Sequence, residues 1–64
     1  MLVNGKSIAL KEPVSLDVFL KEQGYDPRFV AVEKSGQIVP KAEFPQTILN
    51  DQDQLEIVGF VGGG

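Results

Sequence analysis

One short segment, from Ser15 to Gly24 (SLDVFLKEQG), has the apolar spacing of an amphipathic helix, and it limits what this chain can fold into. Leu16, Phe19 and Leu20 recur at helical spacing, whereas the polar side chains that follow them point to water. Ser15 is placed to cap the start of the helix, and Gly24 to end it in a left-handed conformation. We therefore expect one short helix whose apolar stripe forms half of a small core.

The helix needs strands to pack against, because a chain of 64 residues has little else from which to build a core. Chains of this size bury only about 60% of the surface that they expose when unfolded. The sequence has no cysteine and no histidine, so neither a disulfide nor a Cys-rich zinc site can stabilise the fold. The hydrophobic residues, 42% of the chain, must therefore form one core in one domain.

The first strands are expected to form a hairpin around Asn4-Gly5, which lies between two apolar runs. Asn and Gly tolerate the positive φ angles that a type I′ turn needs at both central positions. Strand alternation along the two arms predicts one apolar face, made of Met1, Val3, Ile8 and Leu10.

A second hairpin is expected after Pro27. The stretch from Phe29 to Val32 is rich in β-branched and aromatic residues and predicts a strand. Ser35-Gly36 predicts a tight turn, from which the segment Gln37 to Val39 returns until Pro40 ends the pairing.

The remaining sequence begins with a less periodic stretch, Lys41 to Leu49. Within it, Phe44 is expected to fill the underside of the core, and Thr47 to Leu49 to form a short edge segment. Asn50 to Asp53 is a cluster of turn residues, and Leu55 to Val61 predicts the last strand.

This order of elements predicts an α+β fold, with a single helix packed on one face of a mixed sheet of about four to five strands. The economical arrangement is the β-grasp (ubiquitin-like) fold, whose first and last strands lie side by side and parallel in the middle of the sheet. We expect residues 1–61 to form this domain and residues 62–64 to form a flexible C-terminal glycine tail.

Several classes of function conflict with the composition. Without cysteine or histidine the chain has no thiolate nucleophile and no imidazole base, so we expect a protein that is not itself an enzyme and holds no cofactor stably. The net charge of −3 argues against binding to a nucleic-acid backbone. No apolar run approaches the roughly 20 residues that span a bilayer, so we expect no membrane partner and a cytoplasmic location.

Three carboxylates near the end of the chain, Asp51, Asp53 and Glu56, could suggest a calcium-binding loop. Such a loop also needs a central glycine and a distant bidentate glutamate, which this spacing does not supply. The same residue types are common in ordinary turns, and we expect no metal site.

The chain ends with Phe60, Val61 and three glycines. One interpretation is a flexible linker without a role. The other is that the carboxylate of Gly64 is the reactive group, and that Gly62 and Gly63 allow the active site of another protein to close tightly around the backbone.

Three stretches carry a family resemblance: VNGKSIAL near the start, FVAVEKSGQIVPKAEF in the middle and DQDQLEIVGFVGGG at the end. Together they resemble the ThiS family of sulfur carriers of thiamine biosynthesis, which has the ubiquitin-like β-grasp fold. The chain departs from the family pattern at Ser35, where Asn is usual, at Phe44, where Trp is frequent, and at Gln52, where Gly is usual. These departures concern turns and packing and leave the tail intact.

The resemblance implies that the chain is a substrate of other enzymes. On this basis a ThiF-like adenylating enzyme would activate the carboxylate of Gly64 with ATP. A sulfur donor system of the cysteine desulfurase type would convert it to a thiocarboxylate, which would donate sulfur to thiazole synthase. A molybdopterin-type sulfur carrier and a ubiquitin-like protein modifier stay open, because both begin with adenylation of the same group. A non-covalent interaction module is a further alternative.

The last strand suggests where such partners would hold the domain. If Leu55 and Ile57 face the helix, Val58 and Phe60 share the opposite side of the sheet. We expect that side to be open to water, so that Val58 and Phe60 form an apolar docking patch beside the tail. The alternative is that Phe60 folds over an edge of the core.

Overall fold

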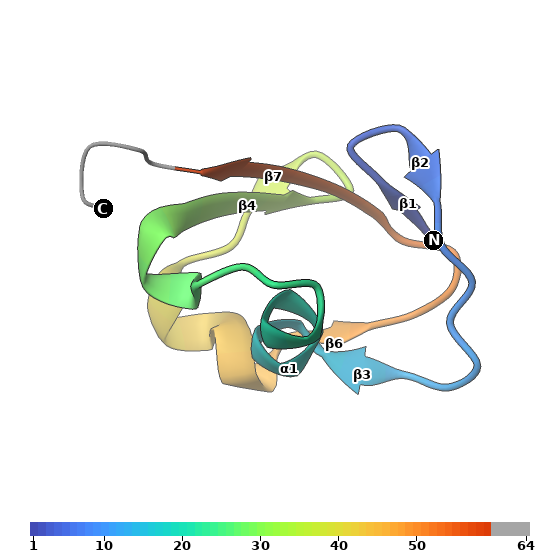
Figure 1. Cartoon of the computed structure of the whole chain (residues 1–64), viewed down its shortest axis with the longest axis horizontal. Coiled ribbons are helices and arrows are strands. Elements are labelled where there is room, and N and C mark those ends of the chain that lie inside the picture. The colour runs from blue at the N-terminus through green and yellow to red at the C-terminus, as the bar shows by residue number, and fades with distance from the viewer. Residues whose placement is uncertain (60–64) are drawn as a thin grey trace.

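A mixed β-sheet with one α-helix packed across one of its faces is the main feature of the computed structural model, which describes residues 1–59 (Figure 1). The elements, including two 3-10 helices labelled η, are in chain order β1 (Leu2–Val3), β2 (Lys6–Ser7), β3 (Val14–Ser15), α1 (Leu16–Glu22), η1 (Pro27–Phe29), β4 (Val30–Lys34), β5 (Gln37–Ile38), η2 (Lys41–Gln46), β6 (Ile48–Leu49) and β7 (Gln54–Gly59).

The five-stranded sheet has the strand order β2-β1-β7-β4-β5. The first strand, β1, and the last, β7, are adjacent and parallel, with Val3 opposite Leu55. The other neighbouring strands of this sheet are antiparallel. The β-grasp fold predicted from the order of elements is thereby confirmed.

Both predicted hairpin turns are present. Asn4 and Gly5 have φ angles of 51° and 83°, and Ser35 and Gly36 have φ angles of 50° and 87°, as a type I′ turn requires. In the first hairpin Met1 and Val3 are buried, and Ile8 and Leu10 are partly buried against the core, so the predicted apolar face is confirmed.

The helix α1 begins after Ser15, as predicted, but the capping contacts differ from the expected ones. The Ser15 hydroxyl makes no bond to the helix backbone and instead donates to Oδ1 of Asp17 at 2.8 Å. That oxygen accepts from the backbone N–H of Val18 at 2.9 Å, so the Asp17 carboxylate performs the role expected of the serine.

The helix ends at Glu22, and Gly24 follows its C-cap residue Gln23 with a φ of +90°, in the left-handed conformation that was predicted for it. The Gly24 amide donates to the carbonyl oxygen of Lys21, and the Tyr25 amide donates to that of Leu20 at 2.8 Å. This pair of bonds is the Schellman arrangement, in which a left-handed residue satisfies the last carbonyl groups of the helix.

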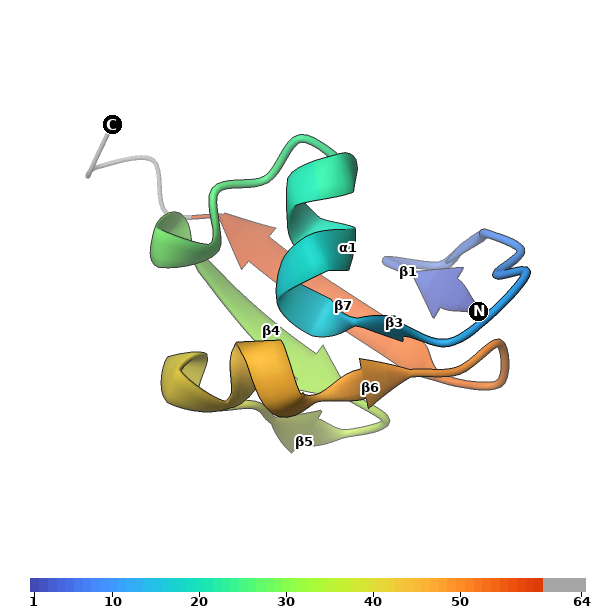
Figure 2. The same cartoon turned by 90° about the horizontal axis from the view of Figure 1, so that it is seen from below.

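The core lies between α1 and the sheet face that it covers (Figure 2). Phe44, on η2, is buried there as predicted. The buried hydrophobic side chains are Met1, Val3, Leu16, Phe19, Leu20, Val30, Val32, Phe44, Leu49, Leu55 and Ile57. Burial of each large apolar side chain contributes roughly 1.5–3 kcal/mol, which is how so small a domain can fold without disulfides.

The strand predicted from Phe29 begins one residue later, so the prediction is wrong at Phe29. This residue ends the 3-10 helix η1, because Pro27 fixes the backbone at the first helical position and Oδ1 of Asp26 accepts from the Arg28 amide at 2.9 Å. The Phe29 ring instead contacts the Arg28 guanidinium, whose carbon lies 5.0 Å from the ring centroid.

The short edge segment predicted near Leu49 is present as β6, which pairs with β3 in a separate two-stranded sheet. The strand β3 was not predicted from the sequence. The strand predicted to end at Val39 ends at Ile38 as β5, although the Val39 amide still donates to the Val32 carbonyl oxygen at 2.9 Å. The turn after Asn50 is confirmed, since the Asp53 amide donates to the Asn50 carbonyl oxygen at 3.0 Å.

The final strand, β7, is confirmed up to Gly59. The last part of its predicted span, at Phe60 and Val61, lies outside the described residues. Among residues 1–59, no helix combines the length and the apolar character that crossing a membrane requires.

Candidate functional site

The sheet has one face that the rest of the described chain leaves uncovered. Figure 1 shows α1, η2 and the β3–β6 pair all on one side of the sheet, with β4 and β7 exposed on the other. Alternation along β7 explains the division: Leu55 and Ile57 point into the core, and Glu56 and Val58 point outward. We call the outward side of β1, β7, β4 and β5 the open face.

The open face carries exposed apolar side chains. Val58 is 60% exposed, and the register places it directly opposite Ala31 of β4. Ile38 on β5 is 76% exposed, and Leu2 on β1 is 40% exposed. Three of the six exposed large hydrophobic side chains in residues 1–59 thus lie on this face, and they are its candidate contacts with a partner.

Two glutamates lie among these apolar side chains. Glu33 of β4 pairs directly with Glu56 of β7, and Glu33 pairs on its other side with Ile38 of β5. A shallow hollow of about 110 Å³ opens at this position, lined by Ala31, Val32, Glu33, Ile38, Glu56 and Val58. The open face is therefore apolar with a pair of carboxylates near its centre.

The predicted reactive end of the chain lies outside the described residues: Phe60 of the proposed docking patch, the tail residues Gly62 and Gly63, and Gly64. The last described residue, Gly59, pairs with Val30 at the start of β4. Of the two predicted docking residues the structure therefore describes Val58 alone, on the side of the sheet where the alternation predicted it.

Leu2, Ile38 and the two glutamates were not predicted from the sequence to be members of this face. Each was visible as an outward residue of a short strand, but three strand pairings bring them together: β4 with β7 and β4 with β5 for the glutamates and Ile38, and β1 with β7 for Leu2. Alternation within one strand gives the side on which a residue lies and does not give its neighbours on the next strand.

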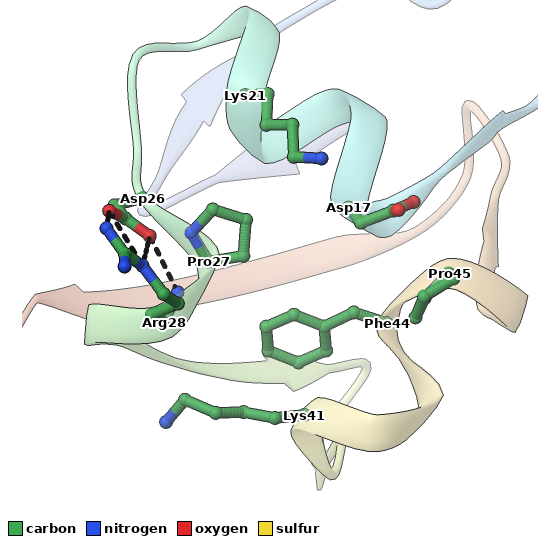
Figure 3. Close-up of a pocket in the computed structure, with 8 residues that line it drawn as sticks. All are labelled: Asp17, Lys21, Asp26, Pro27, Arg28, Lys41, Phe44 and Pro45. Atoms are coloured by element: carbon green, nitrogen blue, oxygen red, sulfur yellow. Dashed lines mark hydrogen bonds and ion pairs between the residues drawn. The ribbon is translucent and has the colours of Figure 1, made fainter.

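A second hollow, of about 410 Å³, lies on the helix side of the domain between α1, η1 and η2 (Figure 3). Phe44 and Pro27 contribute apolar surface, and Lys21 lies at its rim. Two of the charged residues that line it are paired with each other: Arg28 binds Asp26 through both carboxylate oxygens, at 2.7 to 3.2 Å. The Arg28 side chain lowers the pKa of Asp26 to about 2, so this pair stays charged and mutually satisfied.

Two of the three carboxylates that could suggest calcium, Asp51 and Asp53, have structural partners. Oδ1 of Asp51 accepts from the Leu10 amide at 2.9 Å and from the Met1 ammonium at 3.1 Å. Both donors lower the pKa of Asp51, and the Leu10 amide has the larger effect. Oδ2 of Asp53 accepts from the Asn50 amide at 2.7 Å and lies 3.9 Å from the Lys34 ammonium.

Comparison with known proteins gives one consistent result. The model of the ThiS family matches residues 1–64. The sulfur carrier protein ThiS of Bacillus subtilis is 33% identical over 63 residues, and the match covers 97% of this chain and 96% of that protein. The crystal structure of the thiamine biosynthesis protein ThiS from Geobacter metallireducens superposes with a TM-score of 0.82 at 29% identity, covering 98% of this chain and 96% of that one.

A longer relative also matches. A thiazole synthase from Paramagnetospirillum magneticum is 42% identical over 64 residues, which include 100% of this chain, but the chain spans only 20% of the length of that relative. The similarity is therefore confined to one segment of the longer protein.

Proposed function

The chain belongs to the ThiS family, and we propose on that premise that it is a sulfur carrier in the biosynthesis of the thiazole part of thiamine. The observation that carries the proposal is the family match over residues 1–64, supported by the β-grasp topology of the described residues. The carrier acts as a substrate of partner enzymes rather than as a catalyst.

The reactive group in this proposal is the carboxylate of Gly64. A carboxylate is a poor electrophile, and attack by the carboxylate on ATP, with release of pyrophosphate, turns it into an acyl-adenylate. The terminal sulfur of a donor persulfide then displaces AMP and forms an acyl disulfide. Attack by a thiol on the donor-side sulfur breaks the S–S bond and forms a new disulfide with the donor, and the released thiocarboxylate is a soft nucleophile that can pass the sulfur on. Gly62 and Gly63 lack a Cβ, so partner backbone can approach them closely in a narrow active site.

The partners follow from these steps. A ThiF-like enzyme adenylates the carrier, a donor of the cysteine desulfurase type supplies sulfur, and thiazole synthase receives it. The thiazole synthase from Paramagnetospirillum magneticum, which contains a segment similar to this chain, supports the last of these partners. We place the cycle in the cytoplasm, where ATP is available.

Docking of the domain is assigned to the open face. Val58 lies on β7, and Phe60 and the tail follow it in the sequence. An enzyme that binds Val58 and Phe60 would therefore also direct the tail into its active site. Each docking event must order the tail backbone, at a cost of about 1–2 kcal/mol per residue, which favours complexes that release the carrier again.

Intact mass spectrometry tests the proposal. The protein is incubated with ATP, a ThiF-like enzyme and a desulfurase-type donor, and the expected result is a mass gain equal to the replacement of one oxygen by sulfur. A variant without Gly64 should show no gain. If the full chain stays unmodified while a known ThiS protein is converted in the same mixture, the proposed function is wrong.

A further inference from the structure

The glutamate pair on the open face is an arrangement that folding alone does not favour. Glu33 and Glu56 are directly opposite on β4 and β7, and side chains so paired have Cβ atoms about 4.5–5.5 Å apart. Like charges at this position repel each other and destabilise the sheet. Both side chains are exposed on the two strands that form the middle of the domain.

The described chain supplies no cation to this pair. The ion pairs found within residues 1–59 join the Met1 ammonium to Asp51, Arg28 to Asp26 and Lys34 to Asp53. No hydrogen bond to either glutamate side chain occurs in that part of the chain. The two carboxylates therefore keep their acceptor capacity for a group from outside the domain.

The surroundings of the pair are apolar. Ile38 lies directly beside Glu33, and Val58 lies two residues beyond Glu56 on the same strand. A protein that covers Ile38 and Val58 also removes water from the carboxylates between them. Charges in a water-excluded patch interact much more strongly than they do in bulk water, so a cation delivered there binds well, and an uncharged or anionic surface is rejected.

We propose that Glu33 and Glu56 together bind an arginine guanidinium on the enzyme that docks on the open face, and so determine which protein the face accepts. A guanidinium presents five N–H donors in a flat fork and can serve both carboxylates at once, whereas a lysine offers one point charge. A second copy of this chain does not supply this group, because its one arginine, Arg28, is already paired with Asp26 on the helix side of the domain. The inference rests on the proposed carrier function, which supplies the enzyme that presents the arginine.

Binding measurements with charge-matched variants test this. The double variant E33Q/E56Q is compared with E12Q/E22Q, which loses the same charge at two exposed glutamates away from the open face. Dissociation constants are measured for the ThiF-like enzyme and for thiazole synthase. We expect E33Q/E56Q to weaken binding to at least one of them roughly tenfold to hundredfold and to reduce its salt dependence, whereas E12Q/E22Q does not.

A stability measurement separates this role from a structural one. Removing the repulsion should leave the thermal midpoint of the free E33Q/E56Q domain unchanged or raised, so weaker binding cannot reflect unfolding. The inference is overturned if E33Q/E56Q binds both enzymes as tightly as E12Q/E22Q does. That result leaves the mass gain of the wild-type carrier intact, so the two proposals fail separately.

A second experiment tests the binding of arginine without any enzyme, so its result does not depend on whether the wild-type chain is modified. Amide chemical shifts are followed by NMR while the peptide acetyl-Leu-Arg-Leu-amide is added, with the uncharged citrulline peptide as its control. Shifts at Glu33, Ile38 and Glu56 with the arginine peptide only, lost in E33Q/E56Q, support the inference. Equal shifts with both peptides, or none with either, contradict it.

Discussion

The side-chain amide of Asn4 forms two hydrogen bonds with the backbone of Ile57, 53 residues further along the chain. Nδ2 donates to the Ile57 carbonyl oxygen at 3.1 Å, and Oδ1 accepts from the Ile57 amide at 2.7 Å. The residue that makes the first turn thus extends the parallel pairing of β1 and β7 beyond Val3 and Leu55. It thereby anchors the strand that leads to the tail.

Replacing Asn4 with glycine should lower the free energy of unfolding by about 1–3 kcal/mol, because both backbone groups of Ile57 lose their partner. Glycine keeps the positive φ of the turn, so the loss reports the side-chain bonds. Urea unfolding measures it. The control is Ser35→Gly in the other hairpin turn, where the side chain makes no hydrogen bond within residues 1–59; an equal loss there would assign the effect to the backbone.

The stability of the domain should fall at acid pH partly because of Asp51. Its pKa is lowered in the folded state by the Leu10 amide and the Met1 ammonium, so its contribution is fully present above the ordinary value of 3.8 and is lost as pH falls through the lowered value. Asp51→Asn should lower the thermal midpoint at neutral pH and flatten the acid dependence below about pH 4. Glu12→Gln, which removes an exposed carboxylate that makes no hydrogen bond or ion pair within residues 1–59, should change neither quantity. Parallel curves for wild type and Asp51→Asn would contradict the assignment.

Much of this fold follows from local sequence signals. The two turns at Asn4-Gly5 and Ser35-Gly36 and the helix between Ser15 and Gly24 each have a cause within a few residues, and each was predicted. The position of Phe44 in the core followed because a small core has few other large side chains. These signals, placed in order along the chain, were enough to predict the β-grasp arrangement.

What could not be predicted depends on contacts between distant residues. The strand β3 is two residues long and exists because Val14 pairs with Leu49, and such a segment has no periodicity of its own. The glutamate pair of the open face likewise needs the register of β4 on β7. The side of the sheet on which Val58 lies was predictable, since alternation within one strand determines it.

Replacing Gly24, the glycine that follows the C-cap of α1, with alanine should destabilise the domain. Its φ of +90° is unfavourable for a residue with a Cβ, although nothing lies within 4 Å of the place where that atom would stand. Gly24→Ala should therefore lower the free energy of unfolding by about 1 kcal/mol through backbone strain alone. Gly59→Ala, equally uncrowded and without a positive φ, is the control in chemical unfolding and should be neutral or slightly stabilising.

Val58→Asp should separate docking from folding. Val58 is 60% exposed, so a carboxylate there stays in water, and the free energy of unfolding should change by no more than about 1 kcal/mol, the range of strand propensity. On the open face the same carboxylate would lie beside Glu56 and replace an apolar contact, so binding to the ThiF-like enzyme should weaken at least about tenfold.

The control for this prediction is Val18→Asp, which puts the same charge at a valine that is 42% exposed on α1, on the opposite side of the domain. It should leave binding unchanged. Equal weakening by both variants would mean that net charge rather than the open face controls docking. Unfolding of Val58→Asp in a thermal melt would instead mean that this side of β7 is covered by other parts of the chain, and the docking assignment would be lost.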